Sequence, residues 1–139
     1  MPIITRFFIR TGMVCFALAM LCLLLLAARP LISLPDVFGA LTPVYFHLFM
    51  VGWVTQLIFG VAYWMFPIFT KAKPRGSTEL AWFTYAALNL GLLLRVMGEP
   101  MITTSAAPLW RWMLMLSALL QWVAGISFVI NTWPRVKER

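Results

Sequence analysis

The sequence predicts an all-α membrane protein built from four transmembrane helices. Of its 139 residues, 63% are hydrophobic and 11% carry a charge, a balance that a water-soluble domain of this length does not need to fill its core. A transmembrane helix needs about 20 mostly apolar residues. Four stretches meet this requirement: 8–28, 44–69, 80–96 and 109–131. We therefore expect one transmembrane domain over residues 1–139 and no soluble lobe.

The first apolar stretch, 8–28, follows Arg6 and Arg10, so a cleaved signal peptide is a rival interpretation. Its apolar run is about twice the usual length for a signal peptide and ARPLISLP is a poor cleavage site, so we expect a retained helix. Small residues that share one face would let a neighbouring helix approach closely: Gly12, Cys15, Ala19 and Cys22. A metal or redox role for the two cysteines is the alternative.

Short connections join the apolar stretches. RPLISLPDVFGALTP precedes the second stretch, TKAKPRGSTE precedes the third and GEPMITTSAAP precedes the fourth. Ser77 or Thr78 is suited to cap the third helix. Connections this short join antiparallel neighbours, so we expect an up-down-up-down four-helix bundle.

Basic residues gather where the predicted helices leave the membrane, so the net charge of +7 indicates topology and argues against nucleic-acid binding. One side of the membrane would hold most of them: Arg6, Arg10, Lys71, Lys73, Arg75, Arg135, Lys137 and Arg139. The other side would hold Arg29, Arg95 and Arg111, offset by Asp36 and Glu99. The positive-inside rule then places both termini in the cytoplasm. All four acidic residues fall at predicted helix ends or in loops, so we expect no carboxylate within the membrane.

The second stretch contains the single histidine of the chain, His47, about one turn inside its outer end. At 3.6 residues per turn, His47 lies in line with an apolar stripe: Met50, Val51, Val54, Ile58, Val61 and Met65. The opposite face is small or polar, and we expect it to pack inside the bundle: Gly52, Gln56, Gly60 and Tyr63.

This pattern predicts interhelical hydrogen bonds from Gln56 and from Gln121. His47 would then face away from its own bundle, toward lipid, a second protomer or a cofactor. Polar side chains in membrane spans usually have partners and mark function. The alternative is that the His47 ring reaches the headgroups or pairs with Tyr45 or a loop carbonyl.

The pattern HLFMVGWVTQLIFGVAYWMFP has a histidine near the outer end of a span, followed by Gly, Trp, Gly and a terminal Pro. It resembles the second helix of the catalytic subunit of haem-copper oxidases and their nitric oxide reductase relatives. The resemblance covers 42–67 and continues faintly into the third stretch. In that family this histidine is an axial ligand of the low-spin haem b, so the resemblance implies that His47 binds haem b. The chain has no second histidine, which excludes a haem-copper centre, or a bis-histidine haem, within one protomer.

Two ways remain to use one imidazole as a haem ligand. In a symmetric homodimer, two His47 side chains would bind the two faces of one shared haem, which is the arrangement we favour. Alternatively, one protomer holds a five-coordinate haem, or a haem whose second ligand is Met50, Met97 or Met101. Val51 and Val54 would offer apolar surface to the porphyrin edge.

Haem propionates need cations, and three arginines fall at the depth of His47: Arg95, Arg111 and Arg29. Arginine pairs with carboxylates through two parallel hydrogen bonds, so these residues would hold propionates at the outer face. The alternative is that each arginine only extends to the membrane interface.

The sequence therefore predicts an integral membrane haem b protein that serves electron transfer or binds a diatomic gas, and that is not an enzyme on its own. Its expected partners are the lipid bilayer, a second copy of the chain, and respiratory-chain subunits or a redox partner on the outer side. The resemblance implies a bacterial or archaeal plasma membrane. The rival hypothesis is a structural or assembly subunit of a respiratory complex that carries no cofactor of its own.

Overall fold

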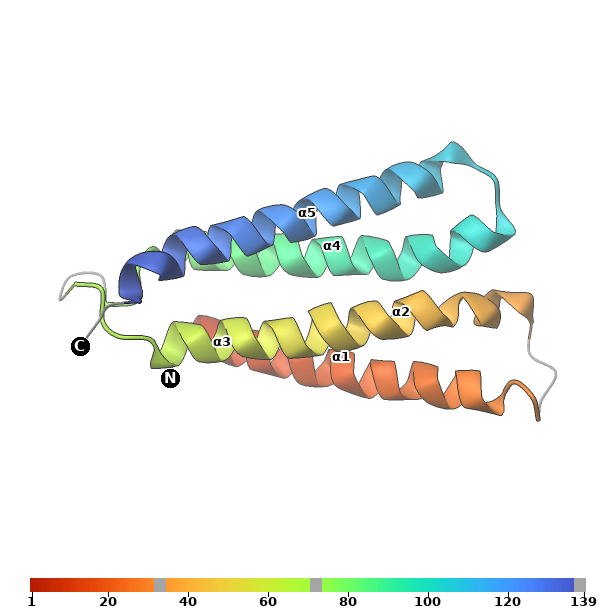
Figure 1. Cartoon of the computed structure of the whole chain (residues 1–139), viewed down its shortest axis with the longest axis horizontal. Helices are drawn as coiled ribbons and strands as arrows, with labels where there is room; N and C mark the ends of the chain where they lie inside the picture. Colours follow the sequence, from red (N-terminus) through yellow and green to blue (C-terminus); the bar gives the residue numbers. More distant parts are fainter. Residues whose placement is uncertain (32–34, 71–73, 137–139) are drawn as a thin grey trace.

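The computed structural model describes residues 1–31, 35–70 and 74–136, and these residues are helical almost throughout. Within these described residues the helices form four long rods, which lie side by side (Figure 1). The first rod is α1 (Ile3–Ala28), the third is α4 (Thr78–Thr104) and the fourth is α5 (Pro108–Thr132), which continues into the short η3 (Trp133–Arg135). The second rod joins four segments end to end: η1 (Asp36–Ala40), α2 (Leu41–His47), η2 (Leu48–Thr55) and α3 (Gln56–Met65).

Four segments are long and apolar enough to cross a membrane: Ile3–Ala28, Phe38–Met65, Thr78–Thr104 and Pro108–Arg135. The predicted all-α fold with four helices of membrane-spanning length is confirmed. The start of α1 and the end of α5 lie at the same end of the bundle, called the terminus end below, and the opposite end is called the loop end (Figure 1). Several residues used in the charge argument lie outside the described residues: Lys71, Lys73, Lys137 and Arg139.

The helix boundaries follow local chemistry. Ser77 precedes α4 and its hydroxyl accepts a hydrogen bond from the Leu80 amide at 3.2 Å, so the predicted Ser77 cap is confirmed. Pro108 occupies the first turn of α5, where no amide hydrogen is required. Phe66 is extended because it precedes Pro67, and α3 therefore ends at Met65.

The third helix is longer than predicted. The sequence places GEPMITTSAAP in a loop because glycine and proline commonly end helices, whereas α4 continues to Thr104 with Pro100 inside it. This part of α4 packs closely against α5 at Gly98. A Cβ atom added to Gly98 would lie only 2.9 Å from Cδ2 of Leu114 on α5. Tertiary packing thus outweighs the local preference, and it brings Glu99 into the helix.

Close helix packing defines two hairpins. In the first hairpin, α1 packs along the second rod through small residues, because a Cβ atom on Gly52 would lie 2.8 Å from Cβ of Cys15. Gly12, Cys15 and Ala19 are buried in this contact, which confirms the predicted small-residue face of α1. In the second hairpin, α4 packs against α5, where the Ser117 hydroxyl donates a hydrogen bond to the Gly91 carbonyl at 2.6 Å.

The segment η2 is a π-helix, and it changes the faces of the second rod. An α-helix turns by about 100° per residue, whereas the wider π-helical turn holds an additional residue, so positions before and after η2 lose their α-helical alignment. Ile58, Val61 and Met65 are exposed, but His47 turns toward α4. The predicted stripe that joins His47 to these residues is therefore wrong, although the opposite face from Gly52 to Tyr63 is buried as expected.

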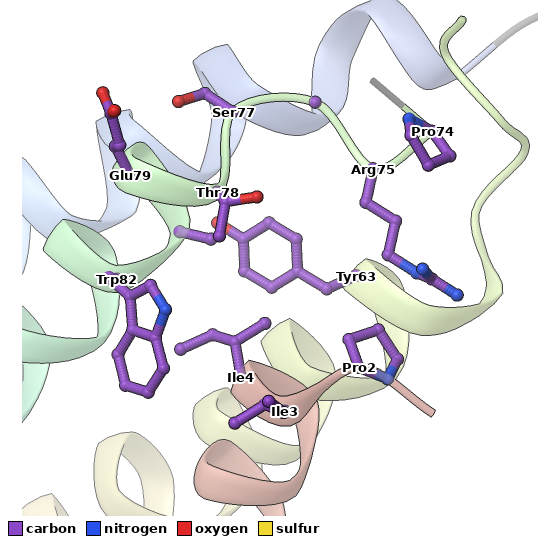
Figure 2. A pocket seen from close by; sticks show the side chains of 12 residues that line it. Pro2, Ile3, Ile4, Tyr63, Pro74, Arg75, Ser77, Thr78, Glu79 and Trp82 are labelled. Carbon is purple, nitrogen blue, oxygen red and sulfur yellow. The ribbon is translucent and has the colours of Figure 1, made fainter. Parts of the chain in front are cut away.

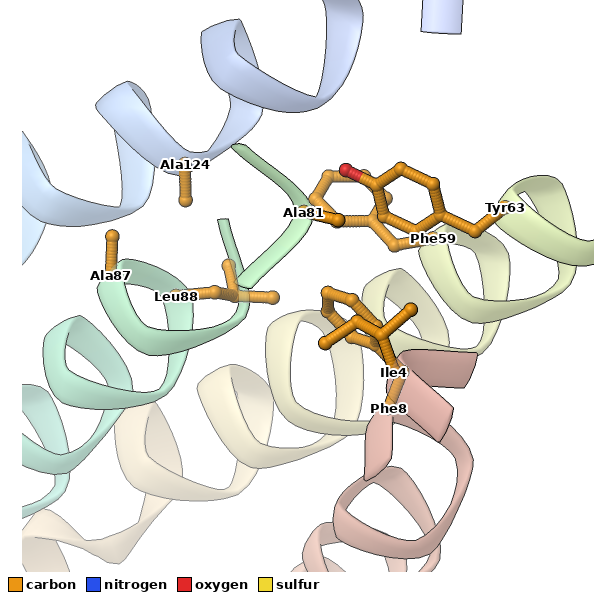
Figure 3. Packing of buried hydrophobic residues seen from close by; sticks show 8 residues of the cluster. All are labelled: Ile4, Phe8, Phe59, Tyr63, Ala81, Ala87, Leu88 and Ala124. Carbon is orange, nitrogen blue, oxygen red and sulfur yellow. The ribbon is translucent and has the colours of Figure 1, made fainter. Parts of the chain in front are cut away.

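Two apolar clusters fill the bundle. The cluster near the terminus end takes residues from α1, α3, α4 and α5 (Figure 3): Ile4, Phe8, Phe59, Tyr63, Ala81, Ala87, Leu88 and Ala124. The Phe59 ring also stacks on the Phe128 ring of α5, with 3.8 Å between ring centroids. The cluster near the loop end joins α1, α2, η2 and α4: Cys15, Ala19, Val44, Leu48 and Leu92.

The terminus end is closed by polar contacts. Arg135 is buried and donates hydrogen bonds to the carbonyls of Tyr63, Phe66 and Pro67, which satisfies the open end of α3. Asn131 accepts a hydrogen bond from the Ser77 amide at 2.8 Å and donates one to the Ser77 carbonyl at 2.9 Å. These contacts attach the end of α5 to α3 and to the start of α4.

The packing predicts that Gly52→Ala destabilises the bundle, because the new methyl group would meet Cys15 and Leu92 within 3.0 Å. Overpacking of this kind costs about 1 to 3 kcal/mol. The measurement is the free energy of unfolding in mixed micelles, followed by circular dichroism. Gly125→Ala is the matched control, because nothing lies within 4 Å of a Cβ atom at Gly125. Equal stability of the two variants would contradict the proposed contact between α1 and η2.

Candidate functional site

His47 is the last residue of α2, and its ring faces two acceptors. Its Nδ1 atom lies 2.9 Å from Oε1 of Glu99 on α4 and 2.9 Å from the carbonyl oxygen of Pro43, one turn earlier. Both partners accept hydrogen bonds, so Nδ1 carries a proton. In the neutral ring, Nε2 then has the free lone pair. The His47 side chain retains 29% of its accessible surface, which leaves the ring partly open.

Glu99 lies at the centre of this cluster. Its side chain is 7% exposed, and its Oε1 atom also lies 3.7 Å from Nη1 of Arg95, one turn earlier on α4. The cluster therefore combines a buried carboxylate, an imidazole and a guanidinium. Its acceptor atom Oε2 of Glu99 and its donor atom Nε of Arg95 are buried and form no hydrogen bond within the described residues.

The location of Glu99 corrects two predictions. The sequence predicts a loop around Glu99, but Glu99 is buried inside α4, a helix of membrane-spanning length. The sequence also indicated that His47 faces away from its own bundle, but Nδ1 of His47 faces Glu99 of the same chain. The physical reason is shared: α4 extends past Gly98, and a buried carboxylate needs a donor or a cation beside it.

The other predicted site residues lie in different environments. Arg95 belongs to the His47 cluster, whereas Arg111 is exposed on α5. Arg29 follows α1 directly and lies against the backbone of Gly39. A Cβ atom added to Gly39 would be 2.8 Å from Nη1 of Arg29. Of the three arginines, Arg95 is the one that contacts Glu99 within the described residues.

The two valines of the predicted porphyrin wall also differ from one another. Val51 packs against both apolar clusters of the bundle, so it faces the interior. Val54 is half-buried. The apolar side chains that are exposed beside His47 in the sequence are Phe46 and Met50.

A polar belt crosses the middle of the bundle. Gln56 is fully buried and exchanges two hydrogen bonds with Asn89 of α4, at 3.1 and 3.4 Å, so the interhelical bond predicted for Gln56 is confirmed. Gln121 instead donates to Ser117 of its own helix at 3.4 Å, and the prediction for Gln121 is wrong. The Thr11 and Tyr85 hydroxyls, on α1 and α4, are 2.7 Å apart.

The two cysteines differ in burial. Cys15 is buried against η2, Cys22 is half-buried, and both are free thiols. The described residues include no group of three or more His, Cys, Asp or Glu side chains that could hold a metal ion. The packing interpretation of the small-residue face therefore accounts for Cys15.

No protein-family model, curated protein or solved structure matches the chain.

Sequence reasoning found His47 and Arg95 but missed the residue that joins them. Gly98 and Pro100 flank Glu99, and this pattern predicts a loop there. The signal that would have found it is the spacing of Arg95 and Glu99, since residues four apart lie on the same helix face.

The cluster predicts that His47 and Glu99 are energetically coupled. In a double-mutant cycle with His47→Ala and Glu99→Gln, we expect a coupling of about 0.5 to 3 kcal/mol, because the two side chains are in direct contact. The measurement is the free energy of unfolding of the two single variants and the double variant in mixed micelles.

The control cycle combines Thr42→Ala with Glu99→Gln. Thr42 is exposed near the start of α2, and the two changes should be additive within about 0.5 kcal/mol. Additivity in both cycles would show that His47 does not contact Glu99.

Proposed function

We propose that this chain is a multi-pass membrane protein that binds haem b through Nε2 of His47, in electron transfer or in the binding of a diatomic gas. The observation that carries the proposal is the arrangement at Nδ1, which faces the Glu99 carboxylate and the Pro43 carbonyl at 2.9 Å each. Histidines that bind metals characteristically donate their other ring N–H to a carboxylate or a backbone carbonyl. This leaves Nε2 oriented and available as a ligand.

The chemistry of a porphyrin suits a site with one protein ligand. The macrocycle supplies the equatorial ligands of its iron, so the chain has to supply only axial ones. Bound haem provides a one-electron Fe(III)/Fe(II) couple or, where an axial position is open, a place for a gas molecule. The partly exposed ring of His47 and the exposed side chains of Phe46 and Met50 support an occupant at the outer surface of α2.

Glu99 and Arg95 would support this role of His47. The carboxylate fixes the ring through Nδ1 and makes the imidazole a stronger ligand. Arg95 partly balances the Glu99 charge, so its use for a haem propionate would compete with that contact. Arg111 is exposed and forms no ion pair within the described part of the chain, so its guanidinium is available for a haem propionate. Arg29 lies beside Gly39 at the loop end.

The second axial ligand is proposed to come from a second copy of the chain. The sequence contains one histidine, and a twofold axis would bring two His47 rings to opposite faces of one haem. The alternative within one protomer is a methionine ligand, for which Met50, Met97 and Met101 are all exposed. Respiratory-chain subunits or a redox protein at the outer face would be the partners in electron transfer.

The proposed topology follows from the charges. Four helices would cross the membrane up-down-up-down, with both termini in the cytoplasm. Among the described residues, Arg6, Arg10, Arg75 and Arg135 belong to the terminus end, against Arg29, Arg95 and Arg111 at the loop end. The loop end, with His47, would then lie near the outer face of a bacterial or archaeal plasma membrane.

The proposal predicts that His47→Ala removes bound haem while the helices remain folded, because the sole imidazole ligand is lost. The measurement is the visible spectrum of detergent-purified protein, oxidised and dithionite-reduced, with helix content checked by circular dichroism. Thr42→Ala, an exposed change on the same helix, should retain the wild-type haem content.

Carbon monoxide separates the two uses of the haem. Reduced bands that do not move with carbon monoxide indicate two axial ligands and electron transfer, whereas a shifted band indicates an open face and gas binding. Wild-type protein that is colourless after expression with ample haem would overturn the proposal and favour the assembly-subunit hypothesis. His47→Ala protein with unchanged haem content would overturn the assignment of His47 as the haem ligand.

A further inference from the structure

The π-helical segment η2 lies between two residues of the second rod that both contact α4. His47 directly precedes η2 and contacts Glu99, and Gln56 directly follows η2 and exchanges hydrogen bonds with Asn89. Gln56 follows His47 by nine positions, which is about two and a half turns of an α-helix. In an uninterrupted α-helix the two side chains would therefore point in opposite directions. The wider turns of η2 bring both of them onto the face that meets α4.

A π-helix of this length needs contacts that stabilise it, because π-helical turns are rare and mostly occur singly within α-helices. The segment η2 has eight residues, and its Gly52 packs closely on two neighbours. A Cβ atom added to Gly52 would lie 2.8 Å from Cβ of Cys15 on α1 and 3.0 Å from Cδ2 of Leu92 on α4. This packing places η2 between α1 and α4, and a second contact acts on the turn itself.

The Thr55 hydroxyl forms a hydrogen bond whose spacing matches the wide turn. It donates to the carbonyl oxygen of Met50, five residues earlier, at 2.8 Å. Threonine hydroxyls in α-helices donate to carbonyls three or four residues earlier. Thr132 does so in α5, where its hydroxyl donates to the Phe128 carbonyl, four residues earlier, at 2.7 Å. Because π-helical hydrogen bonds join residues five apart, the Thr55 contact stabilises η2 relative to an α-helix.

We infer that Thr55 is a positioning residue for His47. Its hydroxyl stabilises the π-helical turns, and these turns direct the His47 ring to Glu99. Thr55 follows His47 by eight positions and acts on it through the backbone of η2. The value of this orientation for haem binding rests on the proposed function, in which Glu99 fixes the His47 ring through Nδ1.

The test repeats the double-mutant cycle of His47→Ala and Glu99→Gln in full-length protein that carries Thr55→Val. Valine keeps the branched shape of the side chain and removes the hydroxyl. The coupling between His47 and Glu99, obtained from free energies of unfolding in mixed micelles, should be lost with Thr55→Val and kept with Thr55→Ser, which retains the donor. If Thr55 only stabilised the bundle, Thr55→Val would lower the stability of every protein in the cycle alike and leave the coupling unchanged.

Thr132→Val is the matched control, because it removes a threonine hydroxyl that donates within an ordinary α-helical turn. It should leave the coupling at its wild-type value. If Thr55→Val protein does not fold, Thr55→Ala and Thr55→Ser give the same comparison with smaller side chains. Coupling that survives without the Thr55 hydroxyl, or that is lost with Thr55→Ser or Thr132→Val, would overturn the inference.

Haem binding by the same variants separates this inference from the proposed function. Thr55→Val should weaken haem binding by about tenfold, because the partner of a metal-binding histidine is lost, and Thr132→Val should not. Wild-type protein that binds no haem would overturn the proposed function, whereas the coupling cycle needs no haem and still decides the role of Thr55. Unchanged haem binding in Thr55→Val protein that has lost the coupling would overturn the link between this orientation and haem.

Discussion

The buried carboxylate of Glu99 constrains the loop end of this bundle. A charge within a membrane-spanning segment requires a partner, and Glu99 has two, with His47 on the neighbouring rod and Arg95 on its own helix. Because His47 and Glu99 belong to different hairpins, their contact also fixes how α2 lies against α4. The same contact orients the His47 ring, so the fold and the candidate site depend on one interaction.

Polar contacts set the arrangement of the hairpins more specifically than the apolar clusters do. Lipid chains are as apolar as leucine, so helices in a bilayer gain little from burying apolar surface and associate through close packing and hydrogen bonds. Along the bundle, Gln56 pairs with Asn89 and Thr11 with Tyr85, and these bonds all involve α4. A shift of α4 by one turn would leave several buried polar groups without partners, which opposes sliding.

The two ends of the bundle differ in chemistry. The loop end combines a partly exposed imidazole with a buried acid, an arrangement suited to holding a ligand through Nε2. The terminus end uses Arg135 and Asn131 to satisfy backbone groups, and it also contains a cavity lined in part by Arg75 and Glu79 (Figure 2). In the proposed topology, the loop end lies near the outer face and would bind the cofactor. The terminus end would contact the headgroups of the inner leaflet.

The sequence alone determined the number and approximate extent of the spans, the small-residue face of α1, the Ser77 cap and the burial of Gln56, because these depend on composition, period and local hydrogen bonding. It also identified His47, whose haem ligation remains a prediction. Tertiary structure decided what surrounds His47. The π-helical η2 changes which residues of the second rod share a face. Packing against α5 keeps α4 helical beyond Gly98 and Pro100. Arg135, which the sequence uses only as evidence for topology, is buried and donates hydrogen bonds to carbonyls at the end of α3. Those outcomes depend on contacts between helices far apart in the sequence, which no local pattern encodes.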